Sequence, residues 1–185
     1  MSGREGLGRL FDIGIAFAPV DLDTANGATG KRINMAMHRT VTFVCALAVG
    51  AADDLTFDVK QHTAYTGGTS NDLDTSGVAG STGIDHFYIK SEAALDNDEA
   101  WTRVDQTAAS EVTLTGATYG DKQNIVAIEI HASMLAAGYT HMSVDVATTT
   151  AAAHLGVGLY LPHGLRFGRA PARLGNLLRP SAVNA

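Results

Sequence analysis

Cysteine is almost absent from this chain. The only one, Cys45, has no partner for an internal disulfide, so the fold must hold without covalent cross-links. It lies inside an apolar stretch, where we expect a small buried core residue. A fold without disulfides is compatible with a reducing compartment.

Long hydrophobic runs are also missing. No segment approaches the roughly 18–20 consecutive apolar residues of a membrane span. The N-terminal stretch has a basic start, but no apolar run long enough to direct export. We therefore expect no membrane partner, and synthesis in the cytoplasm.

Charge is sparse. Charged residues make up 17% of the 185 residues, against 45% hydrophobic residues and 20 glycines. The hydrophobic content argues against intrinsic disorder, and abundant Gly, Thr, Ser and Ala with few Lys and Leu is not typical of a helical bundle. The composition predicts an all-β protein, and the length suits one domain with extensions.

Apolar residues recur at every second position in several segments. The central segment alternates over residues 41–49, breaks at 50–54 and alternates again over 55–59, which predicts a β-hairpin with one buried face. Similar alternation predicts strands at 13–17, 31–37, 86–90, 101–104, 112–114, 123–131, 142–146 and 155–161. We expect one short helix, at 132–138. The pattern predicts a single β-sandwich or jelly-roll-like domain of about eight or nine strands.

Prolines mark expected strand ends. Pro19 predicts an edge strand or a strand end, and Pro162 is expected to end the last strand. We therefore divide the chain into an N-terminal arm (1–12), a β-sandwich body (13–161) and a basic C-terminal arm (162–185).

Sequence motifs that carry chemistry are scarce. The chain has no nucleophile elbow, phosphate-binding loop, HExxH or CxxC motif. Asp72 to Gly77 matches the start of a calcium loop, but Gly83 stands where such a loop requires Glu. The seven histidines lack the close spacing of zinc ligands. We expect no enzyme activity, no catalytic residue, no metal and no cofactor.

The two ends of the chain carry the partner-binding candidates. Four arginines and no acidic residue follow Pro162, so the rest of the chain holds 9 basic and 19 acidic residues. Such asymmetry between a body and its tail is typical of a partner contact, although the tail could instead fold back onto its own acidic body. The C-terminal candidates are Arg166, Phe167, Arg169, Arg173, Leu174, Leu177, Leu178 and Arg179, with Leu165 as a further apolar anchor. The N-terminal candidates are Arg4, Leu7, Arg9, Leu10 and Phe11.

Nucleic acid is a poor match for this charge pattern. The body has excess carboxylates, and Phe167 is the one aromatic residue among the four tail arginines that could stack on a base. We expect no specific nucleic-acid binding and favour a protein partner with an acidic groove.

Six segments occur in a characteristic order: FAPVDLDTANGATGKRINM (17–35), GAADDLTFDVKQHT (50–63), FYIKS (87–91), AWTRVDQ (100–106), QNIVAIEIHASMLAAGYTHMSVDV (123–146) and HLGVGLYLP (154–162). This order resembles a group of structural proteins encoded among the virion genes of tailed bacteriophages. The resemblance covers roughly residues 17–162 and leaves both arms outside. Members of this group are mostly known only as virion proteins, so the resemblance implies a structural role without a position in the particle.

Within that class we expect a capsid cement, or decoration, protein. Its arms would bind and stabilise the lattice of the major capsid protein, and its location would be the virion capsid after assembly in the host cytoplasm. We expect self-association as a homotrimer that matches three-fold lattice positions. One alternative is a head-to-tail connector or tail component. Another is a carbohydrate-binding module on the virion surface, with Trp101, Tyr65, Tyr88, Tyr119 and Asp72 as candidates. For Trp101 itself we favour a core or interface residue over a sugar contact.

Overall fold

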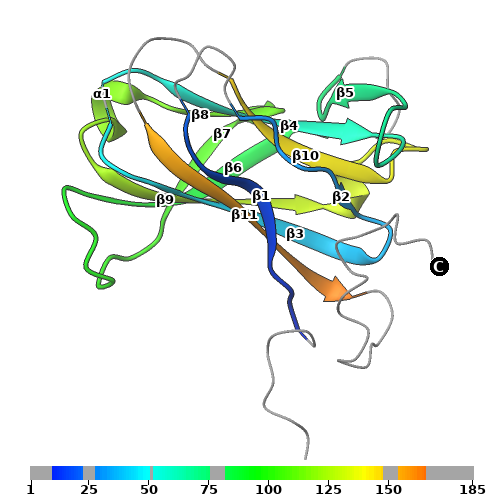
Figure 1. Cartoon of the computed structure of the whole chain (residues 1–185), viewed down its shortest axis with the longest axis horizontal. Coiled ribbons are helices and arrows are strands. Elements are labelled where there is room, and N and C mark those ends of the chain that lie inside the picture. Colours follow the sequence, from blue (N-terminus) through cyan, green and yellow to red (C-terminus); the bar gives the residue numbers. More distant parts are fainter. Residues whose placement is uncertain (1–9, 23–27, 51, 76–81, 148–153, 166–185) are drawn as a thin grey trace, which may run out of the picture.

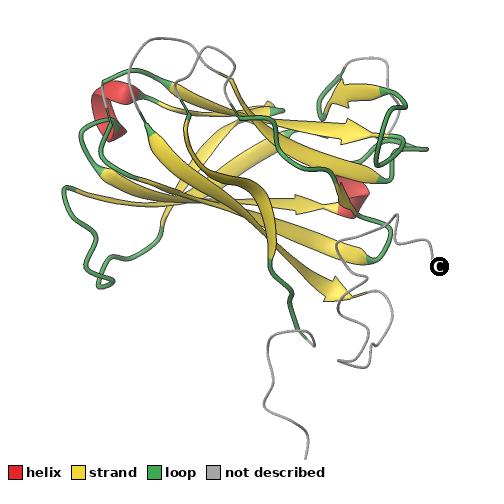
Figure 2. Ribbon diagram, in the orientation of Figure 1, coloured by secondary structure: helices red, strands yellow, loops and turns green. Residues whose placement is uncertain are grey.

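The protein folds as an all-β sandwich of two antiparallel sheets (Figures 1 and 2). The computed structural model describes residues 10–22, 28–50, 52–75, 82–147 and 154–165. Eleven strands lie within these ranges. This confirms the predicted fold class. Every strand but β5 overlaps a segment where alternation predicted a strand, and β5 has no predicted counterpart.

The larger sheet has six strands in the order β1-β11-β3-β9-β6-β7. Their bounds are β1 Gly14–Asp21, β11 Leu155–Leu165, β3 His38–Leu47, β9 Gln123–His131, β6 Ile84–Glu92 and β7 Thr102–Ala109. β3 and β11 therefore lie near the middle of the sheet, between β1 and β9.

The smaller sheet has the order β2-β10-β4-β5, and β8 pairs with the first half of β4. The bounds are β2 Ile33–Asn34, β10 His141–Ala147, β4 Leu55–His62, β5 Ser70–Asp72 and β8 Glu111–Leu114. A short helix, α1, spans Gly116–Tyr119. The expected helical turn after β9 is a 3-10 helix, η1, over Ala132–Met134.

Aromatic side chains join the two layers. The ring centroid of Phe43 lies 6.0 Å from those of Phe17 and Tyr160 in its own sheet and 5.6 Å from that of Phe57 in the opposite sheet. Cys45 is fully buried beside them, as predicted, and burial raises the pKa of its thiol. A fully buried aliphatic or aromatic side chain contributes about 1.5–3 kcal/mol, so this shared core is the main source of stability.

The predicted hairpin over residues 41–61 is wrong. β3 and β4 belong to different sheets, and β3 pairs with β11 and β9 while β4 pairs with β10, β5 and β8. The alternation of apolar residues is as predicted, but the two apolar faces meet across the sandwich instead of lying side by side. Phe43 and Phe57 show this contact directly.

Prolines sit inside two strands. β1 is an edge strand, as Pro19 predicted, but the strand runs on to Asp21 through a register shift between Phe17 and Val20. Pro162 does not end β11, which was the expectation; it lies opposite Val41, and the strand continues to Leu165. Residues 162–165 of the expected C-terminal arm thus belong to the sheet.

Glycines decide which side of β11 faces the core. A Cβ added to Gly158 would lie 2.6 Å from two ring atoms of Phe17, and one added to Gly156 would lie 2.6 Å from Leu22. The missing side chains leave room for these core residues. Because side chains alternate along a strand, the large apolar residues between the glycines point away from the core.

Candidate functional site

The outward side of the six-stranded sheet is apolar across its centre. β11 turns Leu155, Val157, Leu159 and Leu161 outward, and Thr42, Val44 and Ala46 of β3 stand beside them in register. No outward position in these two stretches carries a charged side chain. Leu155 is 60% exposed, which is unusual for a leucine within a strand.

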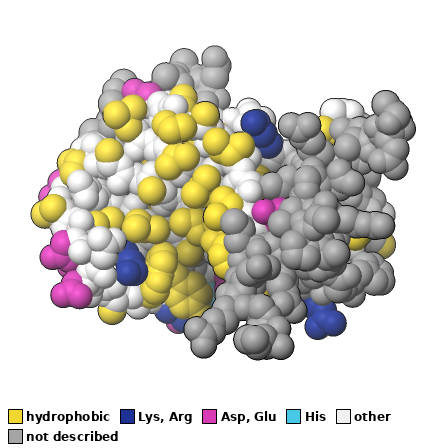
Figure 3. All heavy atoms as spheres, turned by 60° about the horizontal axis from the view of Figure 1, so that its bottom comes forward, with side chains coloured by type: hydrophobic (Ala, Val, Ile, Leu, Met, Phe, Trp, Pro, Cys, Tyr) yellow, Lys and Arg dark blue, Asp and Glu magenta, His cyan; other side chains and the backbone are white. Residues whose placement is uncertain are grey.

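This apolar side extends to both neighbouring strands. We call it the outer apolar face and define it by Ile13, Ile15, Val44, Ala46, Tyr88, Trp101, Ile125, Ala127, Leu155, Val157, Leu159 and Leu161. Figure 3 turns the bottom of Figure 1 towards the viewer and shows hydrophobic side chains gathered on this side, with a few charged side chains among and around them. Soluble monomers rarely expose contiguous apolar patches larger than a few hundred Å².

Both signs of charge occur on the β9, β6 and β7 part of this side of the sheet. Lys90 of β6 lies 5.4 Å from the ring centroid of Trp101. Glu129 of β9 lines a shallow hollow together with Thr42, Tyr88, Trp101 and Ala127. Arg103 and Asp105 of β7 form an ion pair at 2.8 Å. Charge thus lies on the β9, β6 and β7 side of this sheet, away from β11.

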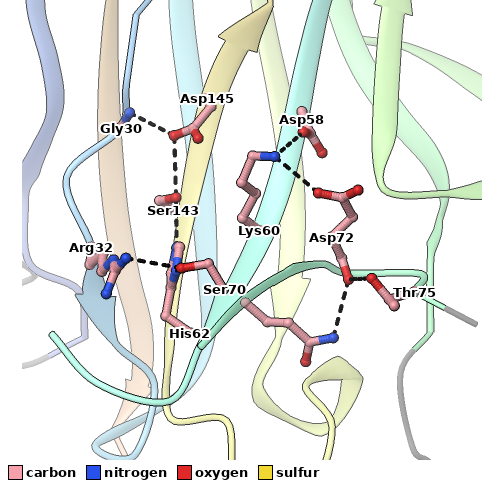
Figure 4. Close-up of polar contacts among 11 residues, drawn as sticks. Gly30, Arg32, Asp58, Lys60, His62, Ser70, Asp72, Thr75, Ser143 and Asp145 are labelled. Atoms are coloured by element: carbon pink, nitrogen blue, oxygen red, sulfur yellow. Dashed lines mark hydrogen bonds and ion pairs between the residues drawn. The ribbon is translucent and has the colours of Figure 1, made fainter. Parts of the chain in front are cut away.

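The outward side of the five-stranded sheet is polar, in contrast to the outer apolar face of the six-stranded sheet. Lys60 forms ion pairs with Asp58 at 2.7 Å and with Asp72 at 3.0 Å (Figure 4). Burial works against the charge on Lys60, but these two carboxylates outweigh it and raise its pKa. Alternation of apolar-in and polar-out residues is what a solvated antiparallel sheet requires, so only the six-stranded sheet departs from it.

A chain of polar contacts crosses the five-stranded sheet (Figure 4). His62 contacts Ser70 Oγ through Nδ1 at 2.7 Å and Ser143 Oγ through Nε2 at 2.9 Å. Ser143 in turn donates to Asp145 at 3.3 Å, and the backbone amide of Gly30 donates to the same carboxylate at 2.9 Å. The chain therefore ties β4 to β5 on one side and to β10 on the other.

The polar contacts among His62, Ser143 and Asp145 involve the residue types of a serine nucleophile site, but in a different arrangement. A catalytic triad places histidine between serine and carboxylate, whereas here Ser143 stands between His62 and Asp145. His62 is 3% exposed and Ser143 is 2% exposed, so substrate cannot reach them in this conformation. Burial lowers the pKa of His62 to about 4, which keeps the ring neutral at neutral pH.

Both chain ends leave the body from one corner. Phe11 forms a β-bridge with His163, and the amide of Asp12 donates to the carbonyl of Pro162 at 3.0 Å. Figure 1 shows the start of β1 and the end of β11 at the same end of the sheet. The residues that begin and end the described body thus lie side by side, next to the outer apolar face.

The predicted arm residues are only partly within the described ranges. Leu10 is 69% exposed and Phe11 is 36% exposed, and both lie shortly before the start of β1. Arg4, Leu7 and Arg9 lie outside the described residues, as do Arg166, Phe167, Arg169, Arg173, Leu174, Leu177, Leu178 and Arg179. The side chain of Leu165 is not described either, although its backbone ends β11.

The proposed glycan candidates lie apart from one another. Trp101 and Tyr88 share the hollow on the outer apolar face, Tyr65 packs against His141 with ring centroids 6.2 Å apart, and Tyr119 packs against the core. Asp72, the first residue of the calcium-like segment, is paired with Lys60. Trp101 is 48% exposed, so it is a surface residue and not a core one.

Comparison with protein-family models, with curated proteins and with solved structures found no match for this chain. Within the described ranges, no group of three or more His, Cys, Asp or Glu side chains is arranged to hold a metal ion. In the same part of the chain, no helix has the length and apolar character needed to cross a membrane.

The outer apolar face is the feature that sequence reasoning missed. Its signal was present, because residues 41–47 and 155–161 are apolar or uncharged at both odd and even positions. Strands buried on both sides have this two-sided pattern. The predicted partner-binding site instead follows the charge of the tail and lies on the arms.

Proposed function

We propose that this protein is a structural component of a tailed-bacteriophage virion, a capsid cement protein that fastens neighbouring copies of the major capsid protein. The observation that carries the proposal is the common corner from which both chain ends leave, joined by the Phe11–His163 bridge and the bond from Asp12 to Pro162. The segmental resemblance to virion proteins supplies the class. The role requires no reaction chemistry, only a rigid body and two attachments.

Two segments that leave from one point can reach different subunits of a lattice. Residues 166–185 add 20 residues after β11, which span up to about 66 Å when extended. A segment that orders on binding costs about 1–2 kcal/mol per backbone residue, so each contact alone is weak. Many copies on a symmetric shell offset this through multivalency.

The charges of the C-terminal tail and of the body suit a partner with an acidic surface. The tail carries four arginines and no carboxylate, while the acidic residues lie in the body and are repelled by the same acidic surface. Electrostatic complementarity of this kind orients an encounter and raises its rate. The tail would make the contact, and the body would remain on the outside of the shell.

The direct test is attachment to capsids that lack this protein. Purified full-length chain is mixed with such capsids, and the bound fraction is measured after sedimentation for wild type, a chain lacking 166–185 and a chain lacking 1–9. We expect each deletion to reduce attachment and the loss of 166–185 to abolish it, with an unchanged melting temperature showing that the body still folds. Full attachment without either segment would contradict the proposal.

Copy number in purified particles separates the shell role from its nearest rival. A cement protein is present in hundreds of copies, whereas a head-to-tail connector or tail ring has roughly a dozen. Quantitative mass spectrometry against the major capsid protein gives this ratio. A ratio that corresponds to roughly a dozen copies per particle would assign the protein to the neck or tail.

A carbohydrate-binding module is the second candidate. The hollow beside Trp101 and Tyr88 favours it, because exposed aromatic rings beside polar groups can stack on sugars. A glycan array with wild type and Trp101→Ala tests it. Binding that depends on Trp101 would support a glycan role, and its absence leaves the hollow to a protein contact.

A further inference from the structure

We infer that the outer apolar face is the site where two copies of this chain meet, sheet against sheet, about a two-fold axis. The inference does not depend on the capsid role, because it concerns the protein alone in solution. It replaces the three-fold cluster expected from the sequence with a pair.

The first argument is the degree to which the face lacks charge. Interfaces between independent proteins are about as polar as the rest of a surface, while homodimer interfaces are more apolar. The centre of the outer apolar face, over β11 and β3, carries no charged side chain from Leu155 to Leu161 or at the outward positions from Thr42 to Ala46. This composition fits a permanent partner.

The second argument is size. The outer apolar face is carried mainly by four strands, β1, β11, β3 and β9, which at a spacing of about 4.8 Å and a length of about 25 Å each cover roughly 480 Å² in projection, and Tyr88 and Trp101 extend it. A specific interface needs about 800 Å² of accessible surface per partner, which side chains standing above such a plane supply. A sheet face of this size can support a stable dimer without help from the arms.

The third argument is self-complementarity. A single patch that packs on itself makes an isologous contact and closes as a dimer, whereas a trimer needs two different patches on each copy. Small side chains at the centre, Thr42, Ala46 and Ala127, let a second sheet approach to the usual 10 Å or so. Glu129 stands opposite Thr42 on β9, and Lys90 lies on the neighbouring strand β6. Their charges are opposite, so Glu129 of one copy can pair with Lys90 of the other.

The other large face makes no such contact. The five-stranded sheet turns Lys60, Asp58 and Asp72 outward, and these charges already pair with one another. Packing this side against a second copy would require removing those groups from water. The pair therefore forms through the six-stranded sheet, and the polar sheets point away from each other.

The test is the mass of the full-length protein in solution. Sedimentation velocity and light scattering from about 1 to 100 µM should give twice the chain mass of 19.3 kDa for wild type. Leu159→Asp places an unpaired charge at the centre of the face and should raise the dimer dissociation constant at least about 100-fold. Leu155→Glu, at a 60% exposed position where folding is not at risk, should weaken the dimer in the same direction.

Thr113→Asp is the matched control, because it adds the same charge on the exposed side of β8 in the other sheet. It should leave the dimer unchanged, and circular dichroism should show the same melting temperature for Leu155→Glu as for wild type. A monomer at 100 µM, a mass of three chains, or a dimer that survives both Leu159→Asp and Leu155→Glu would overturn the inference. A monomeric wild type whose attachment to capsids is lost in Leu155→Glu would overturn it too, and would assign the face to the capsid protein.

Discussion

The hydroxyl of Tyr160 accepts a hydrogen bond of 2.9 Å from the backbone amide of Val144. The two residues belong to different sheets, Tyr160 to β11 and Val144 to β10, so the bond crosses the interior of the sandwich. Tyr160 is 2% exposed, and burial raises the pKa of its hydroxyl, which keeps the group protonated. The same ring packs against Phe43 in the core.

Tyr160→Phe removes this acceptor and keeps the ring. The amide of Val144 is then left buried without its partner, which costs about 1–3 kcal/mol. Urea unfolding should show a lower midpoint with an unchanged slope. Tyr88→Phe, which removes a hydroxyl from the outward side of the same sheet, is the control and should change stability by less than about 0.5 kcal/mol.

Gly158→Ala tests the packing that turns the leucines of β11 outward. The new methyl group would lie 2.6 Å from Phe17 and 2.9 Å from Phe43, both fixed in the core. Overpacking of this kind costs about 1–3 kcal/mol, or a fall of about 2–10 °C in the melting temperature for a chain of this size. Ala108→Val, at an exposed position of β7, should have almost no effect. An unchanged melting temperature for Gly158→Ala would mean that the core side of β11 is loosely packed.

The positions of the strands in the sequence were largely predictable, but which strands pair with one another was not. β9 has the predicted bounds and turns Val126, Ile128 and Ile130 into the core. Alternation identifies the buried side of a strand, but it does not say whether the next strand lies beside it or across from it. The hairpin prediction failed for this reason, since Phe43 and Phe57 satisfy the pattern equally well from opposite sheets.

The partner-binding site at the chain ends stays a prediction, because most of its residues lie outside the described ranges. The structure shows that Phe11 and His163, near the two limits of the described body, form a β-bridge. The outer apolar face needed the structure, because β11 has leucines on one side and glycines on the other. Sequence alone assigns the leucines to the core by hydrophobicity, whereas the space beside Gly156 and Gly158 is filled by side chains from other strands.

Acidification should destabilise the fold through His62. Burial lowers the pKa of His62 from 6.5 to about 4, so between these values the unfolded chain binds a proton that the folded chain does not. Stability therefore rises with pH across this window, and falls by about 1–3 kcal/mol as the pH drops from 6.5 to 4. Burial also lowers the pKa of His141 and adds to this loss, while it raises the pKa of Asp145, which acts in the opposite direction.

A variant isolates the part that belongs to His62. His62→Gln should flatten the dependence of the unfolding free energy on pH between 6.5 and 4, relative to wild type, while the contributions of His141 and Asp145 remain in both proteins. Urea unfolding at half-unit pH steps measures the difference. The control, Thr107→Gln, alters an exposed residue that has no titratable side chain and should leave the slope as it was. Identical slopes for His62→Gln and wild type would show that His62 accepts its proton without unfolding.

The four tail arginines should make capsid attachment sensitive to salt. Replacing Arg166, Arg169, Arg173 and Arg179 together by glutamine removes the charge and keeps the length of the side chains. Exposed ion pairs contribute about 0.2–1 kcal/mol each, so four of them amount to a weakening of roughly 4-fold or more at low salt. At about 1 M salt, where the screening length is near 3 Å, the variant and wild type should bind alike. Arg103→Gln, which removes a body arginine already paired with Asp105, is the control and should bind as wild type does at every salt concentration. A loss of attachment that is equal at low and high salt would mean that the tail binds through its apolar residues and not through its charge.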